Sequence, residues 1–568
     1  MIKVVSVEKM RQIEAAADAA GLSYASMMEN AGAAVAHRAL ELMADMPESR
    51  VTVLVGVGNN GGDGLVAGRL IAATAVAGVR FYLLKRRDDS DPNFKAVTEA
   101  GLFVTYAEDD RDFRVLRNMV ASATLVIDAL FGIGARLPLK ADVAKVLRNI
   151  NQALNDDQMP EHPEGTIITP ALPMPVPVTR PYVLAVDCPS GLDCDTGELD
   201  KNAIPADESM TFIAAKSGLF AFPGAAAVGV LHVATIGVPS DLPDLKAETR
   251  TLVDRGSVRS LLPSRAADSN KGTFGKALIV AGSMNYTGAP ALSAQAAYRV
   301  GTGLVTVGAP ASVVAHLASQ LLEPTWLLLP HDMGVLAAAA AAVVQDEMTG
   351  YDSLLLGPGW GREQTTREFL KTLLAIADQT NKRRPHQPIG FLENVAPSAA
   401  AAATKLPPLV IDADGLNLLS EIDQWWTLLP ENTIITPHPG EMGRLARLPT
   451  ADVLANRWEV AAAKASEWKV ILVLKGAHTL VAASDGRLAV LPFKSDALAT
   501  AGTGDVLAGM ITGFLAQGLN PYEAALLGGY LHGLAGMLAA KKQGNTRSVI
   551  AGDVVAALAD ALTLLDSG

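Results

Sequence analysis

Short runs of β-branched and other apolar residues alternate with longer helix-like stretches along this chain, in two separate series. In the first half the apolar runs cover residues 51–55, 80–84, 124–127, 182–186 and 230–236. In the second half they cover residues 277–281, 304–307, 353–356, 409–411, 433–435 and 470–474. Strands that alternate with helices form βαβ units, whose strands lie parallel in one sheet. The alternation therefore predicts an α/β fold with mostly parallel sheets, and the lack of a repeat of ~20–50 residues disfavours a solenoid.

The alternation lapses in two places, and these divide the chain. The length of 568 residues is about three to four times that of a typical ~150-residue domain, so at least two cores are expected. Residues 156–181 contain seven prolines, which remove backbone donors and predict a surface insertion. Residues 238–250 are polar and proline-bearing, which is typical of a domain linker. We predict an N-terminal Rossmann-like three-layer domain over residues 1–240, a linker over residues 241–250 and a second α/β domain over residues 251–568.

Charge and cysteine content exclude several classes of function. The chain carries 47 basic and 59 acidic residues, and a net charge of -12 argues against a broad surface for nucleic acid or an anionic membrane. Its apolar stretches are shorter than the ~18 residues that a membrane span needs, and residues 1–22 read as a strand entering an amphipathic helix rather than a signal. The two cysteines, Cys188 and Cys194, cannot form a disulfide framework. We therefore expect a cytoplasmic protein without nucleic-acid or membrane partners.

A glycine-rich loop follows the run at residues 51–55 and leads into a helix-like stretch. The loop, residues 56–64, contains the spacing G-x-G-x-x-G of dinucleotide-binding folds. The acidic residue that a dehydrogenase would carry after the next strand is replaced by residues 85–87, Lys-Arg-Arg, so a plain dehydrogenase is disfavoured. Asn59 and Asn60 add side-chain carbonyls to the loop. Oxygen donors suit a hard cation, whereas free backbone amides suit a phosphate.

Carboxylates follow two further strands of the same series. Asp128 follows the run at residues 124–127, and Asp187 follows residues 182–186, with Ser190 just beyond it. The carboxyl ends of neighbouring parallel strands meet at one edge of the sheet, so these side chains are expected to converge there. A helix cap or a loop brace would explain a single aspartate at such a position. Two of them beside the asparagine-bearing loop favour a functional site.

The second series carries its own group of motifs. Glycines and a proline follow a strand at residues 357–361, where they serve either a sharp turn or the close approach of a ligand. His438 lies between two prolines at a strand end and so cannot sit on a helix face. Glycines at residues 502 and 504 open a long apolar helix, whose free amides and dipole favour an anion such as phosphate. Asp505 at this helix start is either a cap or a base that takes a proton from a hydroxyl attacking phosphorus.

Residues 1–240 resemble the epimerase domain of the NAD(P)H-hydrate repair enzymes, through EKMRQIE, MMENAG, GVGNNGGDGLVAGR, DALFGIG, VDCPSGLDCDTGE and AAKSGLFAFPG. The resemblance implies that Asn60, Asp128 and Ser190 help to hold a potassium ion. It implies that Asp187 contacts the hydrated nicotinamide, and we nominate Asp187 as the acid/base group for epimerisation at C6. The substrate-binding residues that it implies besides Asp187 are Asn59, Asn60, Gly61, Gly62, Asp63, Gly132, Ile133, Gly134, Ala135, Arg136, Leu137 and Pro138.

Residues 250–568 resemble the ribokinase-like dehydratase domain of the same enzymes, through KGTFG, GSMNYTGAPALSA, GPGWG, DADGLNLL, TPHPGEMGRL, VLKGAHTLVA and ATAGTGDVLAG. The resemblance implies that the hydrate is bordered by Ala289, Gly359, Gly361, His438 and Asp505. It implies nucleotide contacts by Lys475, Gly476, Ala477, His478, Thr479, Gly502, Thr503 and Gly504. Asp505 would act as the catalytic base, and Mg²⁺ would offset the charge of the nucleotide phosphates. Residues 494–497, Lys-Ser-Asp-Ala, depart from the Asn-Pro or Asn-Ala step of the family.

The two resemblances together predict a bifunctional enzyme of metabolite repair. The first domain would interconvert the R and S hydrates of NADH and NADPH (NADHX and NADPHX). The second would dehydrate the S hydrate with ADP, or ATP, as co-substrate, and the fusion favours ADP. Exposed helices on both sheets make a homo-oligomer the expected assembly. One alternative is a ribokinase-like vitamin or sugar kinase with an accessory Rossmann-like domain, which the His-Pro-Gly-Glu segment at residues 438–441 disfavours. The other treats the first domain as a noncatalytic scaffold.

Overall fold

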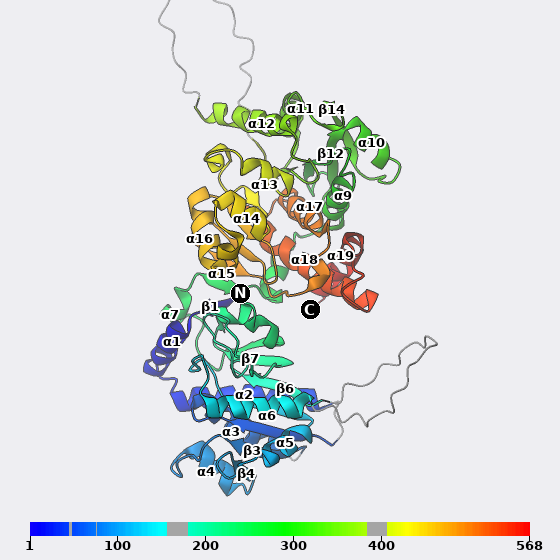
Figure 1. Cartoon of the computed structure of the whole chain (residues 1–568). Helices are drawn as coiled ribbons and strands as arrows, with labels where there is room; N and C mark the ends of the chain where they lie inside the picture. Colours follow the sequence, from blue (N-terminus) through cyan, green and yellow to red (C-terminus); the bar gives the residue numbers. More distant parts are fainter. Residues whose placement is uncertain (45–47, 75, 156–179, 383–405, 568) are drawn as a thin grey trace, which may run out of the picture. The chain divides into compact units, whose positions relative to one another are not determined.

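The computed structural model describes residues 1–44, 48–74, 76–155, 180–382 and 406–567 (Figure 1). The chain forms two compact units, one of Ile2–Glu248 and one of Met1 with Thr249–Gly568. Between residues 241 and 250, where we predicted a linker, the structure has a short helix, α7 (Pro243–Lys246), and the first residue of strand β10 (Arg250–Leu252). The predicted insertion at residues 156–181 lies outside the described residues except for its last two positions.

A parallel sheet forms the centre of the N-terminal unit. Within the described residues its strands follow the order β4-β3-β2-β5-β6-β7-β9, and each pair of neighbours is parallel. The strands are β2 (Arg50–Val55), β3 (Gly78–Leu83), β4 (Phe103–Tyr106), β5 (Leu125–Ala129), β6 (Tyr182–Val186), β7 (Glu208–Phe212) and β9 (Val230–Ala234). The predicted α/β fold with a mostly parallel sheet is therefore confirmed for this unit.

Helices cover both faces of this sheet. One face packs against α1 (Val7–Ala19), α2 (Tyr24–Met43), α3 (Asn59–Ala73) and α4 (Pro92–Glu99). The other face packs against α5 (Arg114–Ala121) and α6 (Ala141–Asn155). The alternation of apolar strands and helices arises because each strand buries side chains on both sides. This three-layer arrangement places the loops after β2, β5 and β6 at one edge of the sheet.

A short additional strand pair closes the N-terminal unit next to that edge. Strand β1 (Ile2–Val5) pairs in parallel with β8 (Ala215–Lys216), with Val5 opposite Lys216. Strand β7 ends at Phe212, and the chain turns into β8 within three residues. The turn carries Ile213 at a φ of 65°, a conformation that β-branched residues rarely adopt. The β1–β8 pairing therefore fixes the backbone position of Lys216.

The C-terminal unit contains a longer sheet. Within its described residues the order is β13-β12-β11-β16-β17-β18-β19-β20-β21-β10, parallel from β13 to β19 and antiparallel from β19 through β21. The strands that place the site are β11 (Lys276–Val280), β12 (Leu304–Pro310), β16 (Ser353–Leu356), β17 (Leu409–Ile411), β18 (Ile434–Ile435) and β19 (Ile471–Leu474). The others are β13 (Thr325–Leu329), β20 (Leu480–Ala482) and β21 (Leu488–Val490).

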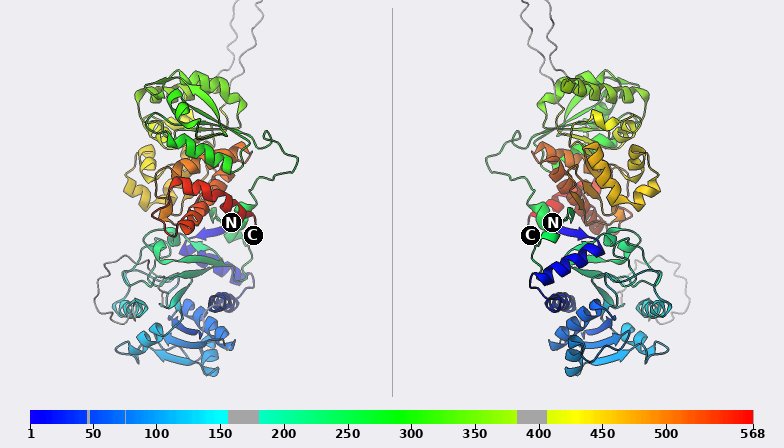
Figure 2. Two further views of the ribbon diagram at one scale, coloured as in Figure 1. Left: turned by 90° about the vertical axis from the view of Figure 1, so that its right-hand side faces the viewer. Right: turned by 90° about the vertical axis from the view of Figure 1, so that its left-hand side faces the viewer.

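Helices also cover this second sheet. The main core contains apolar residues of α9 (Gly288–Arg299), α17 (Thr503–Ala516), α18 (Pro521–Gln543) and α19 (Ala551–Asp566). The two views of Figure 2 show the C-terminal helices, in red, and the gold helices α14 (Pro439–Ala446), α15 (Thr450–Ala455) and α16 (Arg457–Trp468) on different sides of the unit. Helix α17 is buried almost throughout and lies against α9, where a Cβ on Gly509 would come within 2.2 Å of the Ser293 carbonyl oxygen. No helix in the described ranges is long and apolar enough to cross a membrane.

Candidate active sites

The loops at the carboxyl edge of the N-terminal sheet enclose a cavity of about 850 Å³. Several residues that we assigned to substrate binding line it, namely Asn59, Asn60, Asp63, Gly132, Ile133, Gly134, Ala135 and Asp187. Gly61 and Gly62 are turned away from the cavity. A Cβ on Gly61 would lie 2.1 Å from the Gly56 carbonyl oxygen, and one on Gly62 would lie 2.6 Å from the Met28 sulfur. These two glycines therefore serve close packing of α3, and Arg136, Leu137 and Pro138 do not line the cavity.

Asp187 follows β6 directly and its side chain reaches this cavity. Its backbone has a φ of 65°, a left-handed conformation that is costly for a residue other than glycine. Its Oδ2 accepts a hydrogen bond from the Ile133 amide at 3.0 Å. Its Oδ1 accepts from Lys216 Nζ at 2.7 Å and from Thr211 Oγ1 at 3.1 Å. The carboxylate is thus held from both sides, and neither Lys216 nor Thr211 was among the predicted site residues.

Asp128, Ser190 and Asn60 lie at the same edge of the sheet. Asp128 is fully buried, and its carboxylate accepts from Ser190 Oγ at 2.6 Å and from the Ser190 amide at 2.9 Å. Burial raises the pKa of Asp128 to about 6, against the lowering effect of these hydrogen bonds. The Asn60 amide oxygen and nitrogen are buried without a hydrogen-bond partner among the described residues. A buried carboxylate that has no ion pair with any described residue and an unpartnered amide oxygen both fit a cation such as potassium.

Two further carboxyl groups face the cavity. Asp63, in α3, is buried, and the pKa of its carboxyl is raised well above its usual range by burial and by the nearby Asp187 and Glu14. The pKa of Glu14, in α1, is also raised by burial, while Lys216 opposes the shift. The N-terminal cavity is therefore lined by the buried ammonium of Lys216 and by the carboxyl groups of Asp187, Asp63 and Glu14. These four side chains come from different elements of the fold. Asp63 was predicted from the glycine loop, whereas Glu14 was not.

A smaller cavity of about 190 Å³ opens at the start of α17 in the C-terminal unit. Of the residues predicted to contact the nucleotide, Lys475, Gly476, Ala477, Thr479, Thr503 and Gly504 line it. Gly502 precedes the helix with a φ of 90°, which leaves the first amides of α17 without a side-chain cap. Ser495, from the segment that departs from the family pattern, also lines this cavity. Its hydroxyl accepts a hydrogen bond from the Ala497 amide at 3.2 Å.

His478 does not join this cavity with its side chain. The imidazole is buried, and its Nδ1 lies 3.2 Å from the Leu491 carbonyl oxygen. Burial lowers the pKa of His478 to about 4. Its backbone carbonyl oxygen accepts from Arg457 Nη2 at 3.2 Å. His478 therefore stabilises the turn after β19, while its neighbours on both sides line the cavity.

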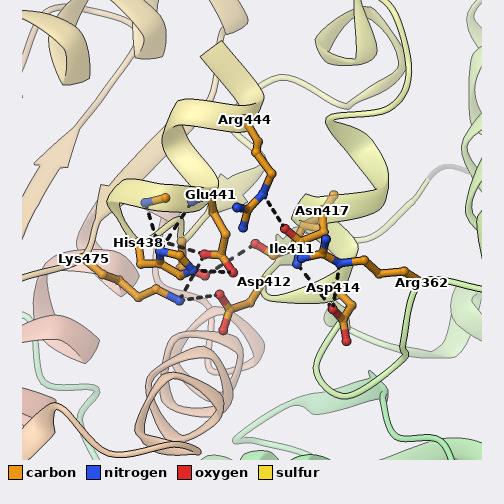
Figure 3. Close-up of polar contacts among 11 residues, drawn as sticks. Arg362, Ile411, Asp412, Asp414, Asn417, His438, Glu441, Arg444 and Lys475 are labelled. Atoms are coloured by element: carbon orange, nitrogen blue, oxygen red, sulfur yellow. Dashed lines mark hydrogen bonds and ion pairs between the residues drawn. The ribbon is translucent and has the colours of Figure 1, made fainter. Parts of the chain in front are cut away.

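Asp505 lies in the first turn of α17, beside a cluster of charged side chains. Burial raises the pKa of Asp505 to about 7, the nearby Asp412 adds to the shift, and Lys475 opposes it. Lys475 Nζ lies 2.8 Å from Asp412 Oδ1 and 3.8 Å from Glu441 Oε2, and Figure 3 shows these three side chains pointing toward one another. A Cβ on Gly504 would lie 3.4 Å from Lys475 Nζ, so the ammonium is next to the helix start.

His438 caps α14 at the edge of this cluster. Its Nδ1 accepts from the Gly440 amide at 3.0 Å, and its own backbone amide donates to Glu441 Oε2 at 2.9 Å, which completes a capping box (Figure 3). Burial and the positive charges of Lys475 and Arg444 lower the pKa of His438. The imidazole is therefore neutral at physiological pH and is about half exposed.

The remaining residues assigned to the hydrate are Gly359 and Gly361, on the loop after β16, and Ala289 of α9. Gly359 has a φ of 66°, and a Cβ there would lie 2.9 Å from the Ala289 Cβ. The Gly361 amide donates to Asp414 Oδ2 at 2.9 Å. Both glycines thus adopt the left-handed conformation where backbone and neighbours come close. Asp412, Asp414 and Glu441 were missed by the prediction, although each lies in a quoted motif and Asp412 directly follows strand β17. Asp128, which we expected just after its strand, lies within β5.

Comparisons with known proteins cover both units. The family model described as NAD(P)H-hydrate dehydratase matches residues 277–380 and 389–558. The model described as YjeF-related protein N-terminus matches residues 24–218. A bifunctional NAD(P)H-hydrate repair enzyme of Moorella thermoacetica is 35% identical over 535 residues, which cover 93% of this chain and 90% of that protein. The chain belongs to the bifunctional NAD(P)H-hydrate repair enzyme family.

Other members of the repair enzyme family and several solved structures match as well. The enzyme of the same name from Thermofilum pendens is 32% identical over 553 residues, which cover 96% of this chain and 93% of that protein. A crystal structure of the ADP/ATP-dependent NAD(P)H-hydrate dehydratase from Bacillus subtilis, co-crystallised with ATP and Mg²⁺, is 28% identical. It covers 56% of this chain and 98% of its own, with a TM-score of 0.45. The resemblance inferred from the sequence motifs to the repair enzyme family is confirmed.

Proposed function

We infer that this chain repairs hydrated nicotinamide nucleotides in two steps. The N-terminal unit interconverts the R and S hydrates of NADH and NADPH, and the C-terminal unit dehydrates the S hydrate at the expense of ADP or ATP. The observation that carries this function is the nearly full-length match to bifunctional repair enzymes, within which each unit encloses a cavity at the expected residues. ADP is the proposed co-substrate, with ATP as the alternative.

In the N-terminal unit Asp187 is proposed as the acid/base group. Its Oδ2 takes the proton of the C6 hydroxyl, and the electron pair of that O–H bond forms a carbonyl at C6. The C6–N1 bond breaks, its electron pair stays on N1, and Asp187 returns the proton to N1. Closure on the opposite face reverses these steps and yields the other epimer, so one carboxylate oxygen suffices and no co-reactant is consumed.

Potassium is proposed to be held in this unit by Asn60, Asp128 and Ser190. When bound, the ion supplies a positive charge that fixes oxygen ligands of the substrate loop and offsets the buried carboxylate. The unpartnered amide of Asn60 and the isolated carboxylate of Asp128 support this assignment. The loops formed by residues 59–63 and 132–138 are proposed to bind the hydrate next to these potassium ligands.

In the C-terminal unit Asp505 is proposed to take the proton of the C6 hydroxyl as this oxygen attacks the terminal phosphorus of the nucleotide. Hydroxide is a poor leaving group, and phosphorylation converts it into phosphate. The nitrogen lone pair at N1 then expels phosphate, and loss of a proton from C5 restores the dihydropyridine ring. Because its pKa is near 7, Asp505 is ionised in a large fraction of the molecules at neutral pH and can act as a base. The same pKa allows it to release the proton afterwards.

The start of α17 and Lys475 are proposed to bind the phosphates of the nucleotide. The bare amides after Gly502 and the adjacent ammonium both attract anions. In the described part of the chain no group of three or more His, Cys, Asp or Glu side chains is arranged to hold a metal ion. Magnesium would offset the charge of the phosphates, and Asp412, whose Oδ2 lies 3.7 Å from the position of a Cβ on Gly504, is proposed to help to hold it.

The assay that tests the function separates the two activities. Mixed hydrate epimers are given to the purified protein with ADP, with ATP or without nucleotide, and the absorbance of reduced nicotinamide is followed. The proposal expects nucleotide-dependent return of this absorbance, with both epimers consumed. A vitamin or sugar kinase would restore none of it, and a noncatalytic N-terminal unit would leave the R hydrate to its slow uncatalysed exchange.

We propose an epimerase domain over residues 1–240, a linker over 241–250 and a dehydratase domain over 251–568. A homo-oligomer is proposed, which the mass of the purified protein in solution would test. A cytoplasmic location is proposed as well, which fits the two free, buried cysteines and which fractionation of the cell would test.

A further inference from the structure

The carboxylate of Asp187 presents its two oxygens to different surroundings. Oδ2 lies on the side of the loop that lines the cavity, because the Ile133 amide donates to it at 3.0 Å and a Cβ on Gly132 would be 2.8 Å away. Oδ1 lies on the side of β7 and β8, where Lys216 and Thr211 donate to it. Only Oδ2 therefore faces the loop that we assign to the substrate.

The ammonium of Lys216 donates hydrogen bonds to three acceptors within the protein. Its Nζ donates to Asp187 Oδ1 at 2.7 Å, to Thr211 Oγ1 at 2.7 Å and to the Phe212 carbonyl oxygen at 3.4 Å. An ammonium has three N–H groups, so these contacts occupy all of them. The side chain is only 1% exposed. Lys216 lines the cavity, but its three donors are directed at acceptors within the protein, so its effect on the reaction is expected to pass through Asp187.

The other charged groups around the cavity do not replace this contact. Glu14 and Arg11 come from α1, and Asp63 comes from α3. Among the described residues, Lys216 is the basic side chain that forms an ion pair with this carboxylate, at 2.7 Å. Two of the neighbouring groups are acidic and would repel the charge of Asp187 if Lys216 were absent. A buried charge that loses its partner is strongly destabilised.

We propose that Lys216 is a positioning residue of the epimerase. Its ion pair compensates the charge of Asp187, occupies Oδ1 together with Thr211, and so directs Oδ2 alone at the C6 hydroxyl of the hydrate. The inference rests on the proposed epimerase function and adds to it the residue that orients the acid/base group. The proton exchanged in the reaction moves only between the hydroxyl oxygen, Oδ2 and N1, and Lys216 keeps its own protons throughout.

The test compares three substitutions of Lys216 in the full chain. Lys216→Met keeps the length of the side chain without its charge, Lys216→Arg keeps a cation, and Lys216→Ala leaves space for an added amine. Lys201→Met, at an exposed lysine of the same unit, is the matched control. Consumption of the R hydrate measures epimerisation, and dehydration of purified S hydrate by the same molecules measures the integrity of the other unit.

We expect Lys216→Met to lower kcat for the R hydrate on the order of 10²-fold, because proton transfer by a positioned group contributes roughly 10²–10⁴-fold. KM should change by less than about threefold, since Lys216 has no donor for the substrate. Lys216→Arg should retain at least about a tenth of the activity, and ethylammonium chloride should restore part of the activity of Lys216→Ala by supplying a cation. Dehydration of the S hydrate should be unchanged in every variant.

Several results would overturn the proposal. Wild-type kcat in Lys216→Met would show that Asp187 needs no cation. A rise in KM with unchanged kcat would make Lys216 a binding residue instead. If Lys216→Met unfolds the unit, Lys216→Ala provides the test instead. The proposal would be refuted if Lys216→Ala has the melting temperature of the wild type and ethylammonium does not raise its activity. Failure of the wild-type protein to consume the R hydrate would instead refute the epimerase function, and this inference with it.

Discussion

Replacing Asp505 by Asn should stabilise the C-terminal unit at alkaline pH while it removes dehydratase activity. Burial raises the pKa of Asp505 from 3.8 to about 7, and Asp412 adds to this shift. The folded protein therefore holds an ionised carboxylate at neutral and alkaline pH against an opposing environment. A neutral amide of nearly the same shape avoids that cost. The ionised carboxylate of Asp505 is thus needed for activity but lowers the stability of the unit.

The pKa shift gives both the magnitude and the sign of the effect. The shift from 3.8 to about 7 corresponds to about 4 kcal/mol at about 1.4 kcal/mol per pH unit. Below pH 3.8 both folded and unfolded chains are protonated, so Asp505 costs nothing. Stability is lost as pH rises from 3.8 to about 7, and the full cost remains above that. For the 320 residues from Thr249 to Gly568, about 4 kcal/mol is roughly 6 °C in Tm.

Scanning calorimetry at several pH values is the appropriate assay, with the dehydratase transition identified by its shift on addition of ADP. The stability gain of Asp505→Asn over wild type should be small near pH 4.5 and greatest near pH 8. Asp346→Asn, at an exposed aspartate of α11 (Ala340–Glu347), is the control and should change Tm little at any pH. Dehydratase turnover of Asp505→Asn should fall on the order of 10²-fold or more. A variant no more stable than wild type at pH 8, or one with wild-type turnover, would refute the reasoning.

Four further outcomes follow from the two sites. Asp187→Ala should spare dehydration of the S hydrate and stop consumption of the R hydrate; disappearance of both epimers faster than their uncatalysed exchange would contradict this. Dehydratase kcat should rise roughly tenfold from pH 6 to pH 8, because a pKa of about 7 ionises Asp505 over that range; a flat profile would exclude it as the base. Gly504→Ala should raise KM for the nucleotide about tenfold, because its methyl group would stand 3.4 Å from the Lys475 ammonium; an unchanged KM would place the phosphates elsewhere. Replacing potassium by tetramethylammonium at equal ionic strength should lower Tm of the N-terminal unit by leaving the Asp128 carboxylate uncompensated; an identical Tm in both salts would argue against the ion.

The strands that the sequence predicted are those with continuous apolar runs. The predicted runs at residues 182–186, 353–356 and 409–411 coincide with β6, β16 and β17 as the structure has them. Strands β4 and β7 were missed, because Phe103 of β4 is exposed at the edge and β7, Glu208–Phe212, carries polar residues that bind neighbouring side chains. Edge and polar strands lack the apolar run that marks a buried strand, so pattern reasoning cannot find them.

The candidate sites were predicted where one residue type alone suggests a role. Asp187 and Asp505 follow strand ends or open a helix, and each reaches its cavity or its charged cluster. Lys216 and Asp412 were missed because their importance lies in partners that are 29 and 63 residues away in the chain. A lysine beside small residues in a sequence carries no sign that it is 1% exposed and bound to a carboxylate. Such pairings are created by the fold and become visible only in three dimensions.

The two sites use a lysine in opposite ways. In the N-terminal unit Lys216 binds the proposed acid/base group itself, and Thr211 and the Ile133 amide complete its hydrogen bonds. In the C-terminal unit Lys475 binds Asp412 instead, and the described residues provide no hydrogen-bond or ion-pair partner at the side chain of Asp505. At the N-terminal site the dedicated cation stays bound to Asp187 while this residue takes and returns a proton, whereas Asp505, which lies beside other carboxylates, has a pKa near 7. This difference matches the chemistry proposed for each unit, since the kinase-like step requires a base that is regenerated once phosphate has left.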